Sequence, residues 1–91
     1  MEKLELVREK INALDQELIK VLAERIKLSD KVAESKIEGN LPQYQPEREE
    51  ELIKNRQKIG REYGLDEEHV RAIFEEIIRE SSRIQKQIMN K

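Results

Sequence analysis

Apolar residues recur three and four positions apart along the first third of the chain. The series consists of Leu4, Val7, Ile11, Leu14, Leu18, Val21, Leu28 and Val32. This spacing places apolar side chains on one stripe of a helix. No proline or glycine interrupts the series before Gly39. The pattern therefore predicts one long helix over about residues 5–37, ended by that glycine.

Two shorter helices are predicted after a turn-rich loop over residues 39–45. Pro46 suits the first position of the second helix, and Asp66 suits the cap of the third, just after Gly64. The buried side of the second helix is expected to consist of Leu52, Ile53, Ile59 and Tyr63. The stripe of the third helix is expected to consist of Val70, Ile73, Phe74, Ile77, Ile78, Ile84 and Ile88. No strand pattern occurs, so the sequence predicts an all-α fold in a single domain, residues 1–91.

The length of the first helix predicts an oligomer. A helix over residues 5–37 is roughly 50 Å long. A compact domain of 91 residues has a radius of gyration of only about 12 Å. Such a helix must protrude, and its apolar stripe needs a partner, so we expect an oligomer.

Composition narrows the function classes. Charged residues make up 42% of the chain, yet the formal net charge is only −2, with acids and bases interleaved. A nucleic-acid binder usually has a one-signed basic patch, so no nucleic-acid partner is expected. No apolar run is long enough for a membrane span or a signal peptide, which favours a cytoplasmic protein. With no cysteine and one histidine, we expect no disulfide and no metal site.

Several polar residues occupy positions where the stripes call for apolar ones. Arg25 follows Val21 in the first stripe, and Lys36 lies 11 residues further on, close to the same helix face. On the third helix, Ser81 and Gln85 continue the inner side one turn apart. Three further polar residues flank the stripes, namely Arg8 beside the first, and Arg48 and Glu49 at the start of the second helix.

Each of these residues also has an interpretation without a ligand. Arg25 could form a buried ion pair that sets helix register, and Lys36 could be a solvated cation near a helix end. Ser81 could bond to its own helix backbone, and Gln85 could specify a helix seam. Arg8 and Arg48 could each be ordinary surface residues.

The cations taken together favour an anionic ligand. Four cationic residues and two neutral hydrogen-bonding residues would gather in a mostly apolar interior with few acids to match them, and a small anion could balance the charge. Arginine favours carboxylates because its guanidinium binds both oxygens. Arg8 and Arg25 are 17 residues apart, roughly 25 Å along one helix. If both bind one molecule, Arg8 must come from a second, antiparallel chain.

These residues lie in segments that resemble the all-α chorismate mutases. The matching segments occur in order over nearly the whole chain: Leu6–Asp15, Leu22–Arg25, Val32–Lys36, Pro46–Glu50 and Ile77–Gln85. The resemblance implies an intertwined helical homodimer that converts chorismate to prephenate, in the biosynthesis of phenylalanine and tyrosine, without a cofactor.

The resemblance also implies roles for single residues. Arg25 and Arg8 of the second chain correspond to arginines that bind the two substrate carboxylates, and Arg48 lines the same pocket. Lys36 and Gln85 correspond to donors to the ether oxygen of the breaking bond. The remaining implied contacts are Glu49 to the ring hydroxyl, Ser81 to a carboxylate, and Gln45 near the hydroxyl.

One departure and two alternatives stay open. Some relatives have an aspartate at the position of Gln45, so we expect altered binding there with activity retained. Isochorismate-pyruvate lyases share the fold and a similar cationic pocket. A non-catalytic helical dimerisation module would also fit the periodicity, and in that case Arg25, Lys36 and Gln85 would matter only to stability.

Overall fold

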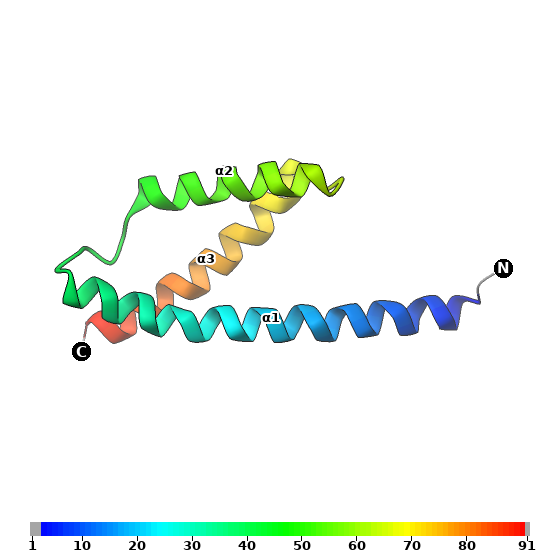
Figure 1. Cartoon of the computed structure of the whole chain (residues 1–91), viewed down its shortest axis with the longest axis horizontal. Coiled ribbons are helices and arrows are strands. Elements are labelled where there is room, and N and C mark those ends of the chain that lie inside the picture. Colours follow the sequence, from blue (N-terminus) through cyan, green and yellow to red (C-terminus); the bar gives the residue numbers. More distant parts are fainter. Residues whose placement is uncertain (1–2, 91) are drawn as a thin grey trace.

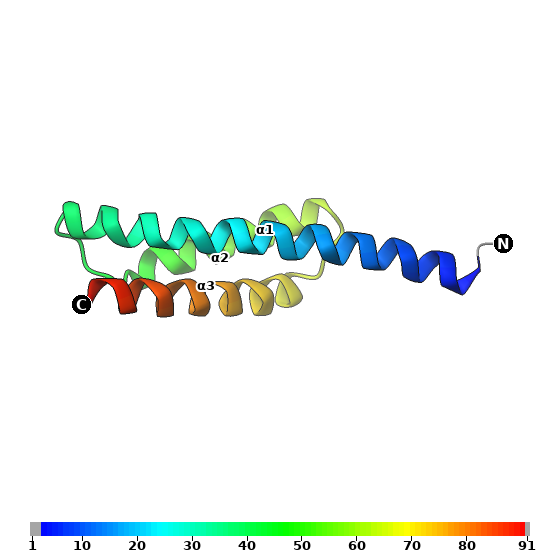
Figure 2. The same ribbon diagram turned by 90° about the horizontal axis from the view of Figure 1, so that it is seen from below.

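The structure, a computed structural model, describes residues 3–90 and contains three helices joined by two loops (Figures 1 and 2). α1 spans Leu4–Glu38, α2 spans Pro46–Glu62 and α3 spans Glu67–Met89. The prediction of one long and two shorter helices is confirmed, and no strand occurs within the described range. None of the three helices is both long and apolar enough to cross a membrane.

Local sequence signals account for the helix ends. The side chain of Asp66 accepts a hydrogen bond of 3.0 Å from the backbone N–H of His69, which confirms it as the cap of α3. Gly39 ends α1 as predicted, but with a φ of −83°. The left-handed residue of that turn is Asn40, with a φ of 54°, and asparagine tolerates this region better than most residues.

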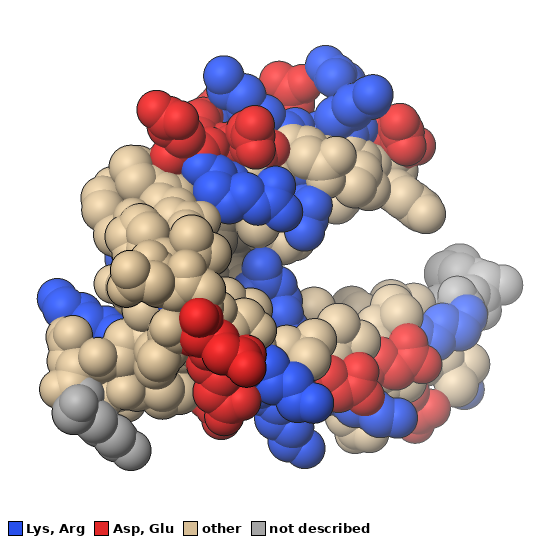
Figure 3. All heavy atoms as spheres, turned by 60° about the vertical axis from the view of Figure 1, so that its left-hand side comes forward, with Lys and Arg blue, Asp and Glu red and all other residues tan. Residues whose placement is uncertain are grey.

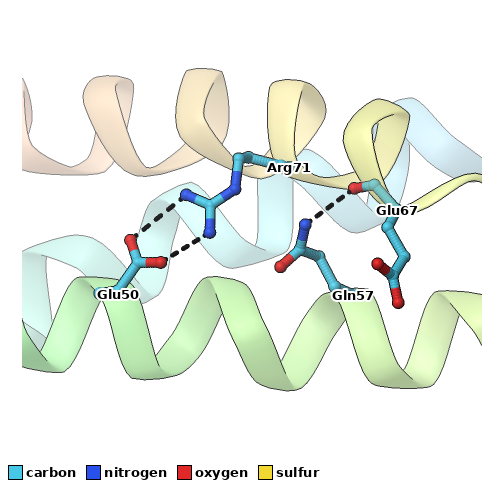
Figure 4. A network of polar contacts seen from close by, with 4 residues as sticks. All are labelled: Glu50, Gln57, Glu67 and Arg71. Carbon is cyan, nitrogen blue, oxygen red and sulfur yellow. Dashed lines mark hydrogen bonds and ion pairs between the residues drawn. The ribbon is translucent and has the colours of Figure 1, made fainter.

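α3 is the central element, because it packs against both α1 and α2, which make no close backbone contact with each other (Figure 1). Glu50 on α2 and Arg71 on α3 form a bidentate ion pair with N···O distances of 2.6 and 3.2 Å (Figure 4). The amide of Gln57 donates to the backbone oxygen of Glu67 at 3.1 Å, which ties α2 to the start of α3. Polar contacts therefore supplement apolar packing between these helices.

The apolar core of the single chain is small. Within residues 3–90, the buried apolar side chains are Ala33, Ile53 and Val70. The buried residues of α1 are Ser29 and Ala33, whose small side chains let α3 lie close to α1. A core of this size leaves most apolar side chains of the chain accessible to water.

The predicted buried side of α2 is partly wrong. Ile53 is buried as expected, but Ile59 is 42% exposed and Tyr63 is 81% exposed. The face that packs on α3 instead runs from Ile53 to the buried Gly60, because two helical turns separate those two positions. In α3, Ile73 of the predicted stripe is likewise exposed.

The apolar stripe of α1 is uncovered in the single chain. Leu14, Leu18 and Val21 are each more than half exposed, and the N-terminal part of α1 extends beyond the other helices (Figure 2). The radius of gyration is 16.6 Å, well above the roughly 12 Å of a compact domain of this length. The helix protrudes as predicted, and the homodimer stays a prediction.

The contact between Gly60 and Val70 generates a stability prediction. A Cβ atom on Gly60 would lie 2.7 Å from Cγ2 of Val70, and Val70 is buried. Overpacking a core typically costs about 1–3 kcal/mol, whereas helix propensity alone would favour alanine by about 1 kcal/mol. We expect Gly60→Ala to lower the free energy of unfolding, measured by urea denaturation at fixed protein concentration.

The same substitution in a Val70→Ala background provides the control. Removal of the valine methyl groups leaves room for the new Cβ, so Gly60→Ala should there be neutral or stabilising. A gain in stability on adding Gly60→Ala to the unchanged chain would show that the two helices do not need this close approach.

Candidate functional site

A pocket of about 410 Å³ lies between α1, the loop over residues 39–45, α2 and α3. Figure 3 shows one face of the molecule hollowed between the arms formed by α1 and α2, with Lys and Arg atoms on its walls. The structure brings seven of the eight predicted site residues to this pocket: Arg25, Lys36, Gln45, Arg48, Glu49, Ser81 and Gln85. Its apolar lining consists of Leu28, Val32, Leu52 and Ile78.

Arg25 is half-buried on the face of α1 that looks into the pocket. Burial and, next, the positive charge of Arg56 lower the pKa of Arg25 from its usual value. No acid lies within ion-pair distance of Arg25 among the described residues. The interpretation of Arg25 as half of a register-setting ion pair therefore finds no partner within residues 3–90.

Lys36 is held by two uncharged acceptors. Its Nζ donates to the backbone oxygen of Gln43 and to Oε1 of Gln85, each at 2.7 Å. Burial lowers the pKa of Lys36, and the nearby carboxylate of Glu49 partly opposes this by raising it. The interpretation of Lys36 as an ordinary solvated cation is wrong, because its ammonium is bonded across to α3.

The two neutral residues of α3 face the same pocket. Gln85 is 8% exposed, and its Nε2 makes only a long contact of 3.4 Å with Oγ of Ser81. Oγ of Ser81 lies 2.5 Å from Oγ of Ser29 on α1, so this hydroxyl bonds to another helix. A primary amide carries two N–H donors, which leaves Gln85 with donor capacity directed at the pocket.

The α2 side of the pocket is more open. Arg48 has a side chain 66% exposed and a loose ion pair of 3.6 Å with Glu51. Glu49 and Gln45 are half-buried, and the amide of Gln45 makes only a 3.5 Å contact with the backbone oxygen of Pro42. These side chains can reorient toward a ligand because their present contacts are weak.

The charges of the pocket suit an anion. Arg25, Lys36 and Arg48 are positive and Glu49 is the one acid in the lining, so the lining residues carry a net charge of +2. Arginine and lysine at a mostly apolar wall are suited to carboxylates. Within residues 3–90, no three His, Asp or Glu side chains are grouped so that they could hold a metal ion.

Arg8 is the predicted site residue that the fold does not bring to the pocket. It is exposed near the start of α1, 17 residues before Arg25 on the same helix. Because Arg8 and Arg25 share one straight helix, the same chain cannot place both around one small molecule.

Four residues near the pocket were missed by sequence reasoning. Ser29, Gln43 and Ser82 line it, and Arg56 on α2 is close enough to Arg25 to affect its pKa. Ser29 could have been found from the helical spacing, since it follows Arg25 by one turn. Gln43 could not, because its backbone oxygen contacts Lys36 and a backbone group has no sequence signature.

Comparisons with known proteins agree on one family. Residues 7–86 match the family described as chorismate mutase type II. A chorismate mutase of Methanocaldococcus jannaschii is 35% identical over 89 residues, which cover 98% of this chain and 90% of that protein.

Bifunctional chorismate mutase/prephenate dehydratases match as well. The protein of Buchnera aphidicola is 38% identical over 84 residues, which cover 92% of this chain and 22% of that protein. The protein of Aquifex aeolicus is 35% identical over 91 aligned residues, which cover 97% of this chain and 25% of that protein. The chain thus spans about a quarter or less of the length of these bifunctional relatives.

Proposed function

Because this chain belongs to the chorismate mutase type II family, we propose that it rearranges chorismate to prephenate in the pocket described above. The observation that carries the proposal is the gathering of three cationic side chains and one acid around about 410 Å³ of mostly apolar space. Chorismate is a dianion with two carboxylates, and the net charge of +2 on the pocket lining matches it.

The substrate is held by the side chains with the weakest present contacts. Arg25, free of any ion pair within the described chain, binds one carboxylate, with the hydroxyl of Ser81 beside it. Arg48 turns from its loose contact with Glu51 to the pocket. Glu49 accepts a hydrogen bond from the ring hydroxyl, and the amide of Gln45 lies next to it. Fixing the flexible dianion in its reactive shape is an orientation effect.

Lys36 and Gln85 act on the breaking bond. The rearrangement is a concerted shift of electrons that needs no nucleophile and no proton transfer, and negative charge grows on the ether oxygen as the C–O bond lengthens. An ammonium has three N–H donors, and two of those of Lys36 are occupied. The third, together with the amide of Gln85, is available to stabilise that oxygen in the transition state.

A second copy of the chain completes the site. The uncovered stripe of α1, with Leu14 and Leu18 more than half exposed, needs an apolar partner. An antiparallel copy of α1 covers this stripe and brings its Arg8 toward the Arg25 of the first chain. The homodimer and the composite pocket are therefore one proposal, supported by the same exposed helix.

Replacement of Lys36 by alanine tests the reaction. We expect kcat/KM for chorismate to fall by about 100-fold or more, the typical loss on removing a donor to a developing oxyanion. Prephenate formation and chorismate loss are measured together, with the oligomeric state checked by light scattering. Lys31→Ala, an exposed lysine on the same helix, is the matched control and should keep its activity.

Two outcomes would contradict the proposed reaction. Unchanged turnover by the Lys36→Ala protein would indicate a helical module in which this lysine has no catalytic role. Pyruvate released from isochorismate, with no prephenate formed from chorismate, would identify a lyase of the same fold instead.

The neutral amide at position 85 predicts a pH effect. In Gln85→Glu the carboxyl group donates to the ether oxygen only while protonated, and an ionised carboxylate beside Lys36 would bind that ammonium instead. We expect the kcat/KM of this variant to fall as pH rises through the pKa of the new carboxyl, without such a fall in the unchanged protein. A pH–rate profile for both proteins checks this, and parallel profiles would exclude a donor role for residue 85.

Mixing two inactive variants tests the composite pocket. Arg8→Ala and Arg25→Ala homodimers each lack one carboxylate ligand in both pockets. After subunit exchange, each heterodimer should contain one pocket with both arginines and one with neither, so activity should return to up to about half per heterodimer. Exchange is verified with differently tagged chains, and failure to recover activity in a purified heterodimer would count against the crossed arrangement.

A further inference from the structure

Gln43 connects α1 and α3, one through its backbone and the other through its side chain. Its backbone oxygen accepts the 2.7 Å hydrogen bond from Nζ of Lys36 on α1. Its side-chain Nε2 donates to Oγ of Ser82 on α3 at 2.9 Å. All three residues line the pocket. We call the hydrogen bond between Gln43 and Ser82 the loop latch.

The loop latch closes a ring of contacts around the ammonium of Lys36. One acceptor of Lys36 is Oε1 of Gln85 on α3. The other is Gln43, which the latch attaches to Ser82 on the same helix. Ser82 and Gln85 are three residues apart and so lie on neighbouring positions of one helix face. Both acceptors of Lys36 are thereby held in place by the same part of α3.

Few other bonds hold this stretch of the loop. Its start is tied to α1 by backbone bonds from Asn40 to Ile37 and from Leu41 to Lys36. Pro42 has no N–H to donate. Among the described residues, the side-chain bond of Gln43 is the one hydrogen bond that connects the loop directly to α3. The position of the Gln43 oxygen therefore depends on the latch.

We propose that Gln43 and Ser82 are positioning residues, which hold the loop on α3 so that the ammonium of Lys36 is fixed toward the pocket. This inference rests on the proposed function, since it assigns Lys36 its task there. A lysine side chain has many rotamers, and two acceptors fixed relative to each other restrict it to few. Orientation of this kind raises the rate of the chemical step without adding a contact to the substrate.

Ser82→Ala is the main test, because it removes one hydroxyl and leaves the helix intact. We expect kcat to fall by about 5- to 10-fold, the loss typical of one hydrogen bond. The KM for chorismate should change by less than about twofold, because the bond supports the transition state more than binding. Ser82→Thr keeps the hydroxyl and should restore most of the activity.

A double variant tests whether both residues act through one bond. Gln43→Ala should lower kcat by about as much as Ser82→Ala. The double variant should be scarcely worse than either single one, because each removes the same contact. If the two losses in kcat were instead additive in the double variant, the proposed role of the loop latch would be wrong.

The matched control is Gln57→Ala. Gln57 also donates across to another element, at 3.1 Å to the backbone oxygen of Glu67, but it does not line the pocket. Its loss should lower the free energy of unfolding and leave kcat unchanged. An equal fall of kcat in this variant would show that Ser82 acts only through stability.

A second measurement on the full-length protein needs no substrate. Exchange of the Lys36 ammonium protons with water, followed by NMR, should become faster in Ser82→Ala and return to the original rate in Ser82→Thr. Unchanged exchange in Ser82→Ala would overturn the inference even if the enzyme turns over chorismate. A protein that converts no chorismate, yet shows the faster exchange, would overturn the proposed reaction and leave the latch in place.

Discussion

Positive charge inside a partly buried pocket is the constraint on which the rest of this structure depends. Arg25 has no acidic partner among the described residues, and Lys36 is bonded to two neutral oxygens. Burial lowers the pKa of both groups, because partial removal from water makes their charged forms less stable. An anion that enters such a pocket reduces this cost, so the arrangement suits an anionic ligand.

The interface between α1 and α3 combines small buried side chains with polar contacts. Small residues, Ser29 and Ala33, are the buried positions of α1, and the hydroxyls of Ser29 and Ser81 meet across the two helices. Larger residues at these positions would push the two helices apart, and one at Ser29 would also enter the pocket. The apolar burial that this interface lacks has to come from elsewhere, and the uncovered stripe of α1 is the surface available for it.

Periodicity and turn chemistry predicted the fold well because they act locally. The three helices, the cap at Asp66 and the end at Gly39 follow from residues within one or two turns of each boundary. The error at Ile59 and Tyr63 arose because α2 is apolar on more than one side, and only its angle to α3 decides which side is buried. Gly60, which carries no side chain, is the point of closest approach to Val70.

The sequence by itself indicated part of the pocket, because polar side chains that interrupt the apolar stripe of a helix lie on the face that packs against other helices. Helical spacing alone placed Arg25 with Lys36, and Ser81 with Gln85. Only the tertiary structure decided which neutral groups hold Lys36, since the oxygen of Gln43 is a backbone atom and Ser82 resembles any serine on a helix. Those contacts depend on how a loop lies against a helix some forty residues away, and local propensity carries no information at that range.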